Sequence, residues 1–259
     1  MSNNLDQKTK NLTLKENVLK DRHEQGRVNR GYFSERDILC INIMGSPGCG
    51  KTSLLELTAA NIKQKISVIE GDLQTERDAD RIKKAGVDAL QITTGRGCHL
   101  DAFMIDKALT QISLDEGQVL FIENVGNLVC PASHDLGSQL NVVLLSIPEG
   151  DDKVGKYPIM FQKADMLLLT KTDLLGFVPY DKNRVYEDFK KVNPKAPVIE
   201  LTLLMNPIKG KSNQTVNEEE NQNNGLSQWL TFIDQKKSEI KHNNQDEINN
   251  EITNQVNPT

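Results

Sequence analysis

The sequence has few of the features that mark secreted, membrane-spanning or nucleic-acid-binding proteins. It contains only four cysteines in 259 residues, at positions 40, 49, 98 and 130, and this spread does not resemble a disulfide framework. No apolar run approaches the roughly 18 residues that a membrane-spanning helix needs, and the N-terminus is polar. The net charge of −5 creates no general attraction to nucleic acid. We therefore expect a cytoplasmic protein that binds neither nucleic acid nor a membrane, with thiols that are available to bind metal.

The clearest motif that is present is GSPGCGKT at residues 45–52, which fits the G-x-x-x-x-G-K-[ST] pattern of a phosphate-binding loop. Glycines let backbone N–H groups approach phosphates, and the start of a helix favours an anion. Lys51 is expected to reach the β- and γ-phosphates and Thr52 to ligate Mg2+. A glycine-rich turn without a ligand is the alternative, which the complete motif disfavours. The residues expected to contact nucleotide here are Gly45, Ser46, Gly48, Cys49, Gly50, Lys51, Thr52 and Ser53.

Apolar segments that alternate with helical patterns predict an α/β fold, in which helices cover both faces of a mostly parallel sheet. The expected strands are 38–44, 66–71, 88–92, 119–122, 140–147, 166–169 and 198–201. The expected helices are 51–64, 72–85, 99–112, 180–192 and 225–239. We expect a GTPase domain at 36–239 that contains a polar insert at 211–224. A polar, partly helical extension at 1–35 would precede it, lying on the domain or reaching a partner, and a disordered tail at 240–259 would follow it.

Further residues are expected around the base, the magnesium ion and the γ-phosphate. The segment 170–173, with Thr170, Lys171 and Asp173, resembles the guanine-specific N-K-x-D motif of GTPases. Asp173 would accept two hydrogen bonds from guanine and Lys171 would lie over the base, the alternative being a helix start that Asp173 caps. The remaining nucleotide-site candidates, at the ends of other strands, are Asp72, Glu123 and Gly126.

Asp72 and Glu123 each end a strand, and we expect both to complete a Mg2+ site with Thr52, although each could instead be a helix cap or a loop charge. Gly126 could offer its N–H to the γ-phosphate, which would make 123–127 a switch segment. Lys51, Asp72 and Glu123 are the catalytic candidates, and no residue stands out as the base that activates water. The arginines at 77 and 81 are either surface charges or phosphate neighbours.

Cys98 and His99 adjoin each other after one expected strand, and Cys130 follows another at the same edge of the sheet. Thiolate and imidazole suit Ni2+ and Zn2+, and three such ligands leave a position open or filled from a second subunit. Because Cys130 comes shortly after Gly126, we expect metal affinity to be coupled to the nucleotide state. Buried thiols without metal are one alternative. A catalytic Cys–His pair is another, although no acyl-transfer residues accompany it.

Several motifs in combination resemble HypB, the family of nickel-incorporation GTPases of hydrogenase maturation, which belongs to the SIMIBI class of phosphate-loop GTPases. They are the phosphate loop, EGDLQTERDA at 70–79, GCHLDA at 97–102, ENVGNLVCPA at 123–132, KYP at 156–158 and the segment 170–173. The resemblance implies GTP-dependent homodimerisation, slow GTP hydrolysis and a Ni2+ or Zn2+ site at the dimer interface, formed by the two cysteines and the histidine. It also implies delivery of nickel to the large subunit of [NiFe]-hydrogenase, with a HypA-type partner.

The chain departs from the family pattern at several places. It has neither the N-terminal cysteine-rich nickel motif nor the histidine-rich stretch of some relatives, so nickel storage is not expected. Phe103 stands where many relatives have histidine, Thr170 replaces an asparagine, and Thr202 begins an unusual loop after the last strand. A small-molecule kinase shares the phosphate loop and is one alternative function, but no arginine-rich lid is evident. A non-catalytic nucleotide-binding scaffold is the other alternative.

Overall fold

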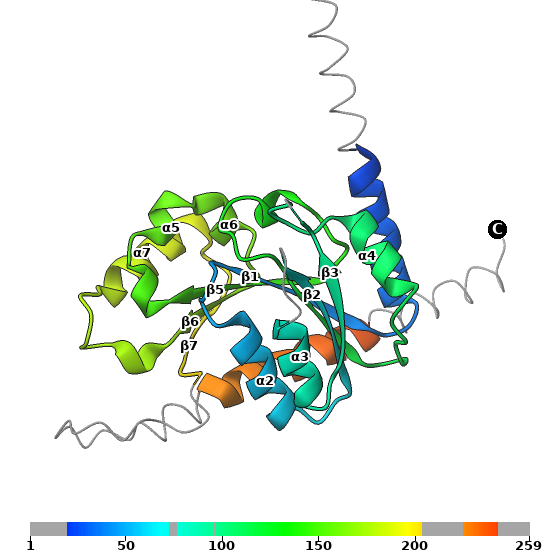
Figure 1. Ribbon diagram of the computed structural model, residues 1–259. Helices are drawn as coiled ribbons and strands as arrows, with labels where there is room; N and C mark the ends of the chain where they lie inside the picture. Colours follow the sequence, from blue (N-terminus) through cyan, green and yellow to red (C-terminus); the bar gives the residue numbers. More distant parts are fainter. Residues whose placement is uncertain (1–19, 73–76, 96, 204–224, 243–259) are drawn as a thin grey trace, which may run out of the picture.

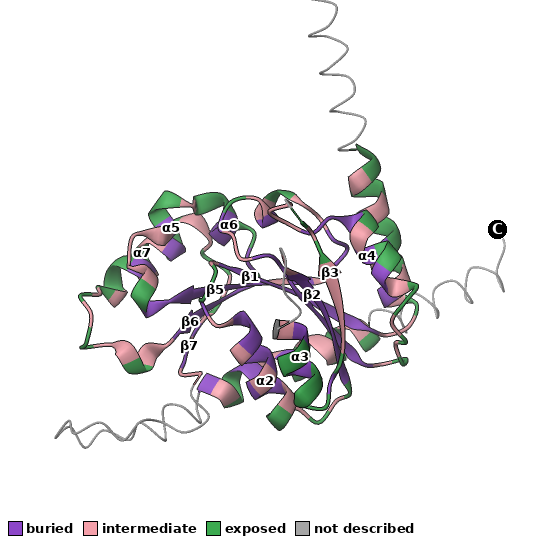
Figure 2. Cartoon of the chain, in the orientation of Figure 1, coloured by how far each residue is buried: buried purple, intermediate pink, exposed green. Residues whose placement is uncertain are grey.

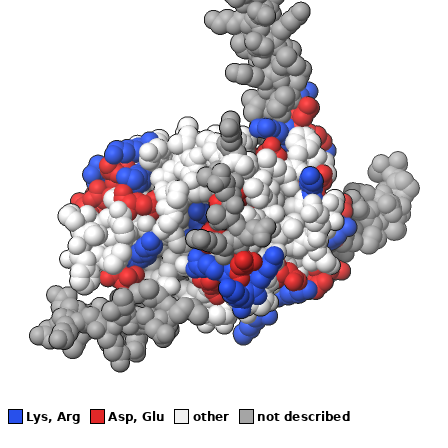
Figure 3. All heavy atoms as spheres, in the orientation of Figure 1, with Lys and Arg blue, Asp and Glu red and all other residues white. Residues whose placement is uncertain are grey.

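The computed structural model describes residues 20–72, 77–95, 97–203 and 225–242 (Figure 1). The expected polar insert lies outside the described residues, as do the first part of the N-terminal extension and most of the expected C-terminal tail. Among the described residues, no helix is both long enough and apolar enough to cross a bilayer. Figure 3 shows acidic and basic side chains intermingled on one face of the molecule, without a large field of either sign.

Seven strands form one parallel sheet, in the spatial order β3-β2-β4-β1-β5-β6-β7. The strands are β1 (Leu39–Gly45), β2 (Ile66–Asp72), β3 (Asp88–Thr93), β4 (Val119–Glu123), β5 (Leu140–Ser146), β6 (Met166–Thr170) and β7 (Val198–Leu201). Each matches an expected strand to within one residue at either end. The α/β fold with a parallel sheet is therefore confirmed. The central position of β1 brings the phosphate loop between β4 and β5.

The labelled helices are α2 (Lys51–Asn61), α3 (Arg77–Lys84), α4 (Ala102–Leu109), α5 (Lys153–Lys156), α6 (Pro158–Gln162) and α7 (Lys182–Val192). Two more helices cover residues 20–34 and 225–242. The prediction of a helix from residue 99 was wrong by three residues, because the Asp101 side chain accepts a hydrogen bond from Met104 N and caps α4. Cys98 and His99 are therefore in a loop. The short helices α5 and α6 were not predicted.

One face of the sheet is covered by α2, α3 and the helix 225–242 (Figure 1). Side chains alternate along a strand, so Leu39, Ile41 and Ile43 of β1 all point to this face. Trp229 from the C-terminal helix is fully buried against it and donates a hydrogen bond from its indole N–H to Thr58 Oγ1 at 2.9 Å. The C-terminal helix is therefore an integral layer of the domain.

The other face is covered by two groups of helices, with 20–34 and α4 over one side and α5 to α7 over the other. Figure 2 shows that burial follows the sheet and the inner surfaces of the helices. Phe33 is fully buried, and the Asn29 side chain donates hydrogen bonds to the backbone oxygens of Ala102 and Leu136. The described part of the N-terminal extension therefore lies on the domain, which is one of the two arrangements expected from the sequence.

Candidate functional site

The phosphate loop connects β1 to α2 through backbone conformations that glycine adopts readily. Gly48 and Gly50 have φ of 76° and 103°, in the left-handed region that other residues avoid. A Cβ on Gly45 would lie 2.6 Å from the carbonyl oxygen of Leu144, so only glycine fits there. Gly50 is the N-cap of α2, and its own carbonyl accepts the first helical hydrogen bond from Leu54 N at 2.8 Å. The loop thus has the strand-to-helix geometry that the motif requires.

Lys51 and Thr52 start α2 and are nearly buried. The ammonium group of Lys51 donates to the carbonyl oxygen of Ser46 at 3.4 Å, within the loop itself. Thr52 Oγ1 donates to Glu123 Oε1 at 2.9 Å, which joins the phosphate loop to the end of β4. The structure thus brings together two of the three residues expected at the magnesium site.

Three carboxylates gather where β2 and β4 end. Glu70 lies beside Glu123 in the parallel register of the two strands, and Asp72 follows two residues later. Burial, then the charges of Glu123 and Asp72, raise the pKa of Glu70 to about 8. Burial also raises the pKa of Glu123 to about 7, against the opposing effects of Lys51 and Thr52. The Oε2 atoms of Glu70 and Glu123 are buried and have no hydrogen-bond partner.

This oxygen-rich donor set fits a hard divalent cation, because Mg2+ prefers hydroxyl and carboxylate oxygens. A bound cation would give the buried oxygens of Glu70 and Glu123 a partner and would favour their ionised forms. Glu70 was not among the predicted site residues, because it lies inside a strand and not at its end. The signal that could have found it is an acidic residue inside an otherwise apolar strand.

The segment 170–173 lies against the phosphate loop. Thr170 is buried, and its hydroxyl donates to the carbonyl oxygen of Cys49 at 2.7 Å. The ammonium group of Lys171 donates to the carbonyl oxygen of Gly48 at 2.7 Å. Asp173 is exposed. Although Thr170 replaces the asparagine of the guanine motif, its hydroxyl still braces this segment against the loop that would hold the phosphates.

Two other predicted neighbours of the nucleotide have structural contacts. Ser53 Oγ accepts a hydrogen bond from Arg81 at 3.2 Å, and Arg81 forms an ion pair with Glu56 at 2.6 Å. Of the two readings for Arg81, a surface charge is therefore the one that the structure supports. Cys49 is fully buried, and burial raises the pKa of its thiol to about 11, so it packs as a small apolar residue.

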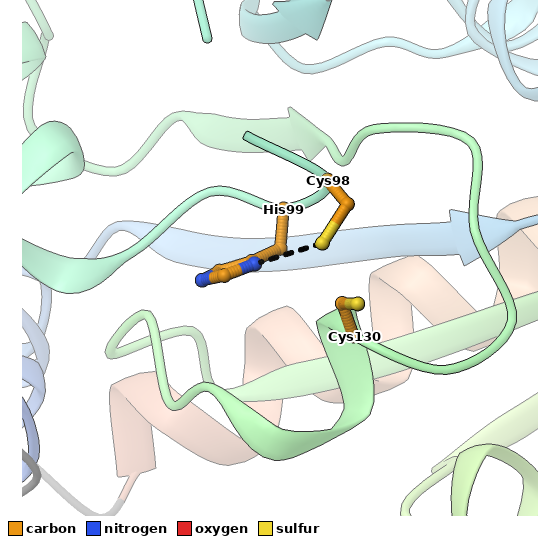
Figure 4. A group of neighbouring side chains, drawn as sticks. All are labelled: Cys98, His99 and Cys130. Atoms are coloured by element: carbon orange, nitrogen blue, oxygen red, sulfur yellow. Dashed lines mark hydrogen bonds between the residues drawn. The ribbon is translucent and has the colours of Figure 1, made fainter. Parts of the chain in front are cut away.

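Cys98, His99 and Cys130 come together within one chain (Figure 4). Their potential ligand atoms all lie within 4.8 Å of one another, and Cys98 Sγ is 3.5 Å from His99 Nδ1. All three side chains are half-buried. A hydrogen bond to Cys130 contributes most to a raised pKa for Cys98, and burial followed by the charges of His134 and Arg22 lowers the pKa of His99. A neutral imidazole beside two thiols is a set that a borderline-soft cation could use.

Asn127 connects this cluster to the phosphate loop. Its backbone N–H donates to the carbonyl oxygen of Gly45 at 2.9 Å, and its side-chain nitrogen donates to the carbonyl oxygen of Cys98 at 3.3 Å. Its side-chain oxygen accepts from the backbone N–H groups of Val129 and Cys130 at 2.8 and 3.4 Å. One residue therefore holds the first glycine of the phosphate loop and both cysteine-bearing segments. Asn127 lies in the predicted switch segment, but its role there was not predicted from the sequence.

Gly126 lies directly against the phosphate loop. A Cβ at this position would be 2.8 Å from both the nitrogen and the Cα of Pro47, so the two backbones are in close contact. The segment 123–127 thus runs from Glu123, which contacts Thr52, past Gly126 to Asn127. Direct contacts thus connect the phosphate loop to the segment that leads to Cys130.

The chain is similar to proteins of known families. The family model for the CobW/HypB/UreG nucleotide-binding domain matches residues 39–200. The hydrogenase/urease maturation factor HypB of Helicobacter pylori strain J99 is 44% identical over 202 residues, which are 76% of this chain and 84% of the relative. The hydrogenase maturation factor HypB of Escherichia coli K12 is 41% identical over 225 residues, which are 86% of this chain and 72% of the relative.

Solved structures show the same similarity. HypB from Helicobacter pylori, crystallised in complex with nickel, superposes with a TM-score of 0.75 at 40% identity, covering 85% of this chain and 96% of that one. HypB from Archaeoglobus fulgidus superposes with a TM-score of 0.71 at 35% identity, covering 84% of this chain and 99% of that one. The region matched by the family model includes the phosphate loop, the carboxylate cluster and the segments that carry Cys98, His99 and Cys130.

Proposed function

Because the chain belongs to the HypB family of hydrogenase and urease maturation factors, we propose that it is a GTP-hydrolysing nickel metallochaperone. Family membership confirms the resemblance that the motifs indicated. The phosphate-loop nucleotide-binding domain is a property of the family, whereas GTP hydrolysis, nickel delivery and dimerisation are parts of the proposal. The small-molecule kinase and the non-catalytic scaffold remain the alternatives that the experiments below separate from it.

In this proposal the triphosphate lies along the phosphate loop. Backbone N–H groups of residues 45–53 bind its oxygens, and Lys51 exchanges its contact with Ser46 for the β- and γ-phosphates. Thr52, Asp72 and Glu123 hold Mg2+, which when bound neutralises charge on the phosphates. Gly126 offers its N–H to the γ-phosphate. The close contact between Gly126 and Pro47 supports this placement.

The base is guanine in this proposal, and it lies against the segment 170–173. Asp173 is exposed and could accept hydrogen bonds from the two guanine donors that adenine lacks. Lys171 keeps its ammonium group on Gly48, which leaves its aliphatic stem to lie along the base. Thr172 Oγ1 lies 3.0 Å from Thr202 Oγ1, so the loop after β7 closes the other side of this segment.

The transported metal is nickel, held by Cys98, His99 and Cys130, with zinc as a second candidate. The two thiols lose protons when they bind a divalent cation, so metal uptake is expected to release acid. Three ligands leave one position, which a second copy of the chain or a partner could fill during transfer. A GTP-dependent homodimer, a HypA-type nickel chaperone and the hydrogenase large subunit are the partners in this scheme, and the cytoplasm is its location.

The observation that carries the proposal is the bonding of Asn127 to the phosphate loop and to both cysteine segments. A nucleotide hydrolase whose thiols bind no metal would not need hydrogen bonds that connect its cysteine-bearing segments to Gly45. In a metallochaperone this connection lets GTP hydrolysis alter the metal site, so that metal is released at a defined step.

GTP hydrolysis is tested with purified protein, Mg2+ and either GTP or ATP. The wild type is expected to release phosphate from GTP. Lys51→Ala is expected to lower this rate at least about 100-fold, because it removes a positive charge that stabilises the negative charge of the transition state. Lys63→Ala, an exposed change on the loop after α2, is the matched control. Turnover of ATP with an acceptor would favour a kinase, and no turnover would favour a scaffold.

Dimerisation is tested by light scattering with GDP and with a non-hydrolysable GTP analogue. The proposal expects a larger fraction of dimer with the analogue, and less of it in Cys98→Ala when metal is present. A monomer under all these conditions would contradict the coupling of dimer formation to nucleotide, although it would leave GTP hydrolysis intact.

A further inference from the structure

A second histidine lies against the proposed metal ligand His99. The imidazole rings of His99 and His134 are stacked, with their centroids 3.6 Å apart and their planes at 21°. His134 follows the short 3-10 turn η1 (Pro131–Ser133), which begins directly after Cys130. The two rings thus come from the two segments that carry the cysteines. No motif in the sequence singles out this histidine.

Both nitrogens of His134 are already engaged. Its Nδ1 is 2.9 Å from the carbonyl oxygen of Cys130, which can only accept, so Nδ1 carries the proton and donates. Its Nε2 is 3.4 Å from Arg22 Nη1, and a guanidinium group can only donate, so Nε2 accepts. With both nitrogens committed, His134 is unsuited to be a fourth metal ligand. Its ring is instead held at a fixed place over His99.

Arg22, from the helix 20–34, contacts both sides of the cluster. Besides its contact with His134, its Nη2 forms an ion pair with Asp101 Oδ2 at 3.4 Å. Asp101 caps α4 two residues after His99, using its other carboxylate oxygen. The Arg22 guanidinium therefore links the segment that carries Cys98 and His99 to the segment that carries Cys130.

Core packing does not fix the His134 ring by itself. His134 lines a cavity of about 290 Å³ together with residues that include Arg30, Ser138 and Lys163. The stack on His99 and the two hydrogen bonds are contacts that orient the ring. His99 lies on the loop ahead of α4, where its ring contacts the Cys98 thiol and stacks on His134.

From this geometry we infer that His134 is a positioning residue, which holds the His99 imidazole toward the two thiols, and that Arg22 fixes His134 in that role. The inference rests on the proposed metal function of Cys98, His99 and Cys130. It extends that function to the N-terminal helix, because a change in the helix 20–34 would reach the metal ligands through one guanidinium group. The contacts of Arg22 and His134 form a unit that we call the His134 clasp.

The experiment titrates nucleotide-free full-length protein with Co2+ and with Ni2+, and follows the thiolate charge-transfer bands and affinity by chelator competition. His134→Ala is expected to weaken binding about tenfold and to alter the cobalt ligand-field bands, as loss of outer-shell support does at other metal sites. His134→Phe restores a stacked ring and should recover much of the affinity. Arg22→Ala should weaken binding less than His134→Ala. Arg27→Ala, an exposed change on the same helix, should leave it unchanged.

A second measurement separates positioning from folding. In metal-free protein, the His99 imidazole proton resonances should carry a ring-current shift from the stacked ring, lost in His134→Ala and kept in His134→Phe. Thermal unfolding of each variant shows whether it is folded.

The outcomes are distinct. If the wild type binds metal and His134→Ala binds as tightly with an unchanged cobalt spectrum, the clasp is overturned while the proposed function stands. If the wild type binds neither metal, the proposed function fails and the positioning role fails with it. Weakened binding in folded His134→Ala, with recovery in His134→Phe, supports the clasp.

Discussion

At the scale of single residues, the nucleotide site concentrates acidic groups where water is scarce. Glu70 and Glu123 are 2% and 4% exposed and lie on neighbouring strands. Burial is the largest cause of both raised pKa values, and the charge of Glu123 adds to it at Glu70. A site of this kind is costly to the free protein and becomes favourable when a divalent cation binds, so binding and stability should be linked.

Replacing Glu70 should change how stability depends on pH. Its pKa is raised to about 8 in the folded protein from an ordinary value of 4.5. A raised carboxyl pKa means that the folded state resists ionisation, so its stabilising effect is present at pH 4 and is lost as pH rises through about 8. In EDTA, Glu70→Gln should therefore gain stability relative to the wild type between pH 5 and pH 9. Urea unfolding at both pH values measures this, with exposed Glu116→Gln as control.

A relative stability of Glu70→Gln that is the same at pH 5 and pH 9 would contradict the account of Glu70. With Mg2+ and nucleotide present, in contrast, the stability of Glu70→Gln relative to the wild type should differ little between pH 5 and pH 9. A bound cation keeps the carboxylates ionised at both pH values. Comparing the two conditions thus also tests whether Glu70 lies close enough to feel the cation.

Gly126→Ala should disturb the nucleotide site through backbone contact alone. The new Cβ would lie 2.8 Å from backbone atoms of Pro47, so either the switch segment or the phosphate loop must move. A displacement near 1 Å costs a reaction about 100-fold, and we expect a loss of that order in GTP turnover. Gly31→Ala, where a Cβ meets nothing within 4 Å, is the control. Normal turnover in Gly126→Ala would show that this contact is unimportant.

Motif residues could be predicted at this scale because their chemistry depends on nearby sequence. The phosphate-loop motif requires glycine at the positions of Gly45 and Gly50, and both residues have positive φ in the structure. The acidic residue inside β2 was a signal for Glu70, but its position beside Glu123 depends on strand register. The role of His134 could not be predicted, because it depends on a contact between distant segments. The chain alone does not reveal which strands are neighbours.

At the scale of elements, the strands were easier to predict than the helix ends. Buried parallel strands are short, continuous apolar runs, and all seven were found at their expected places. Helix starts depend on capping, so α4 begins after Asp101 and α7 after Asp181, where the side chains accept backbone hydrogen bonds. The start of α4 matters for function, since it leaves Cys98 and His99 in a loop that can turn toward Cys130.

The C-terminal helix should contribute strongly to stability. Trp229 is fully buried, packs against Phe121 of β4 and donates to Thr58 of α2. Trp229→Ala should reduce the free energy of unfolding by about 3–5 kcal/mol, as large cavity-forming changes do. Chemical denaturation measured by circular dichroism tests this, because the only tryptophan is lost in the variant. Thr231→Ala, exposed on the same helix, is the control. A loss below about 1 kcal/mol would mean that the helix is peripheral.

At the scale of the whole molecule, the sheet order decides how the two sites meet. β4 lies between β2 and β1, so its end is next to the phosphate loop on one side and the carboxylates of β2 on the other. The chain that leaves β4 then passes Gly126 and Asn127 before it reaches Cys130. The sequence predicted this proximity of metal ligands and switch. The bonding of Asn127 to Gly45 and Cys98 is what the fold adds.

In the proposed function, Asn127 is the residue that connects the nucleotide site to the metal ligands. Asn127→Ala keeps all three metal ligands and the whole phosphate loop, but it removes the side-chain hydrogen bonds to Cys98, Val129 and Cys130. We expect this variant to bind nucleotide normally and to bind nickel with an affinity that no longer responds to the nucleotide. Loss of nucleotide binding instead would show that the side chain supports the phosphate loop rather than the connection.

The most direct test is the Ni2+ affinity of the full-length protein, measured by chelator competition with GDP and with a non-hydrolysable GTP analogue, each with Mg2+. The account predicts affinities that differ by at least about fivefold between the two nucleotides in the wild type, and by much less in Asn127→Ala. Equal wild-type affinities with both nucleotides, under conditions where both are bound, would contradict it.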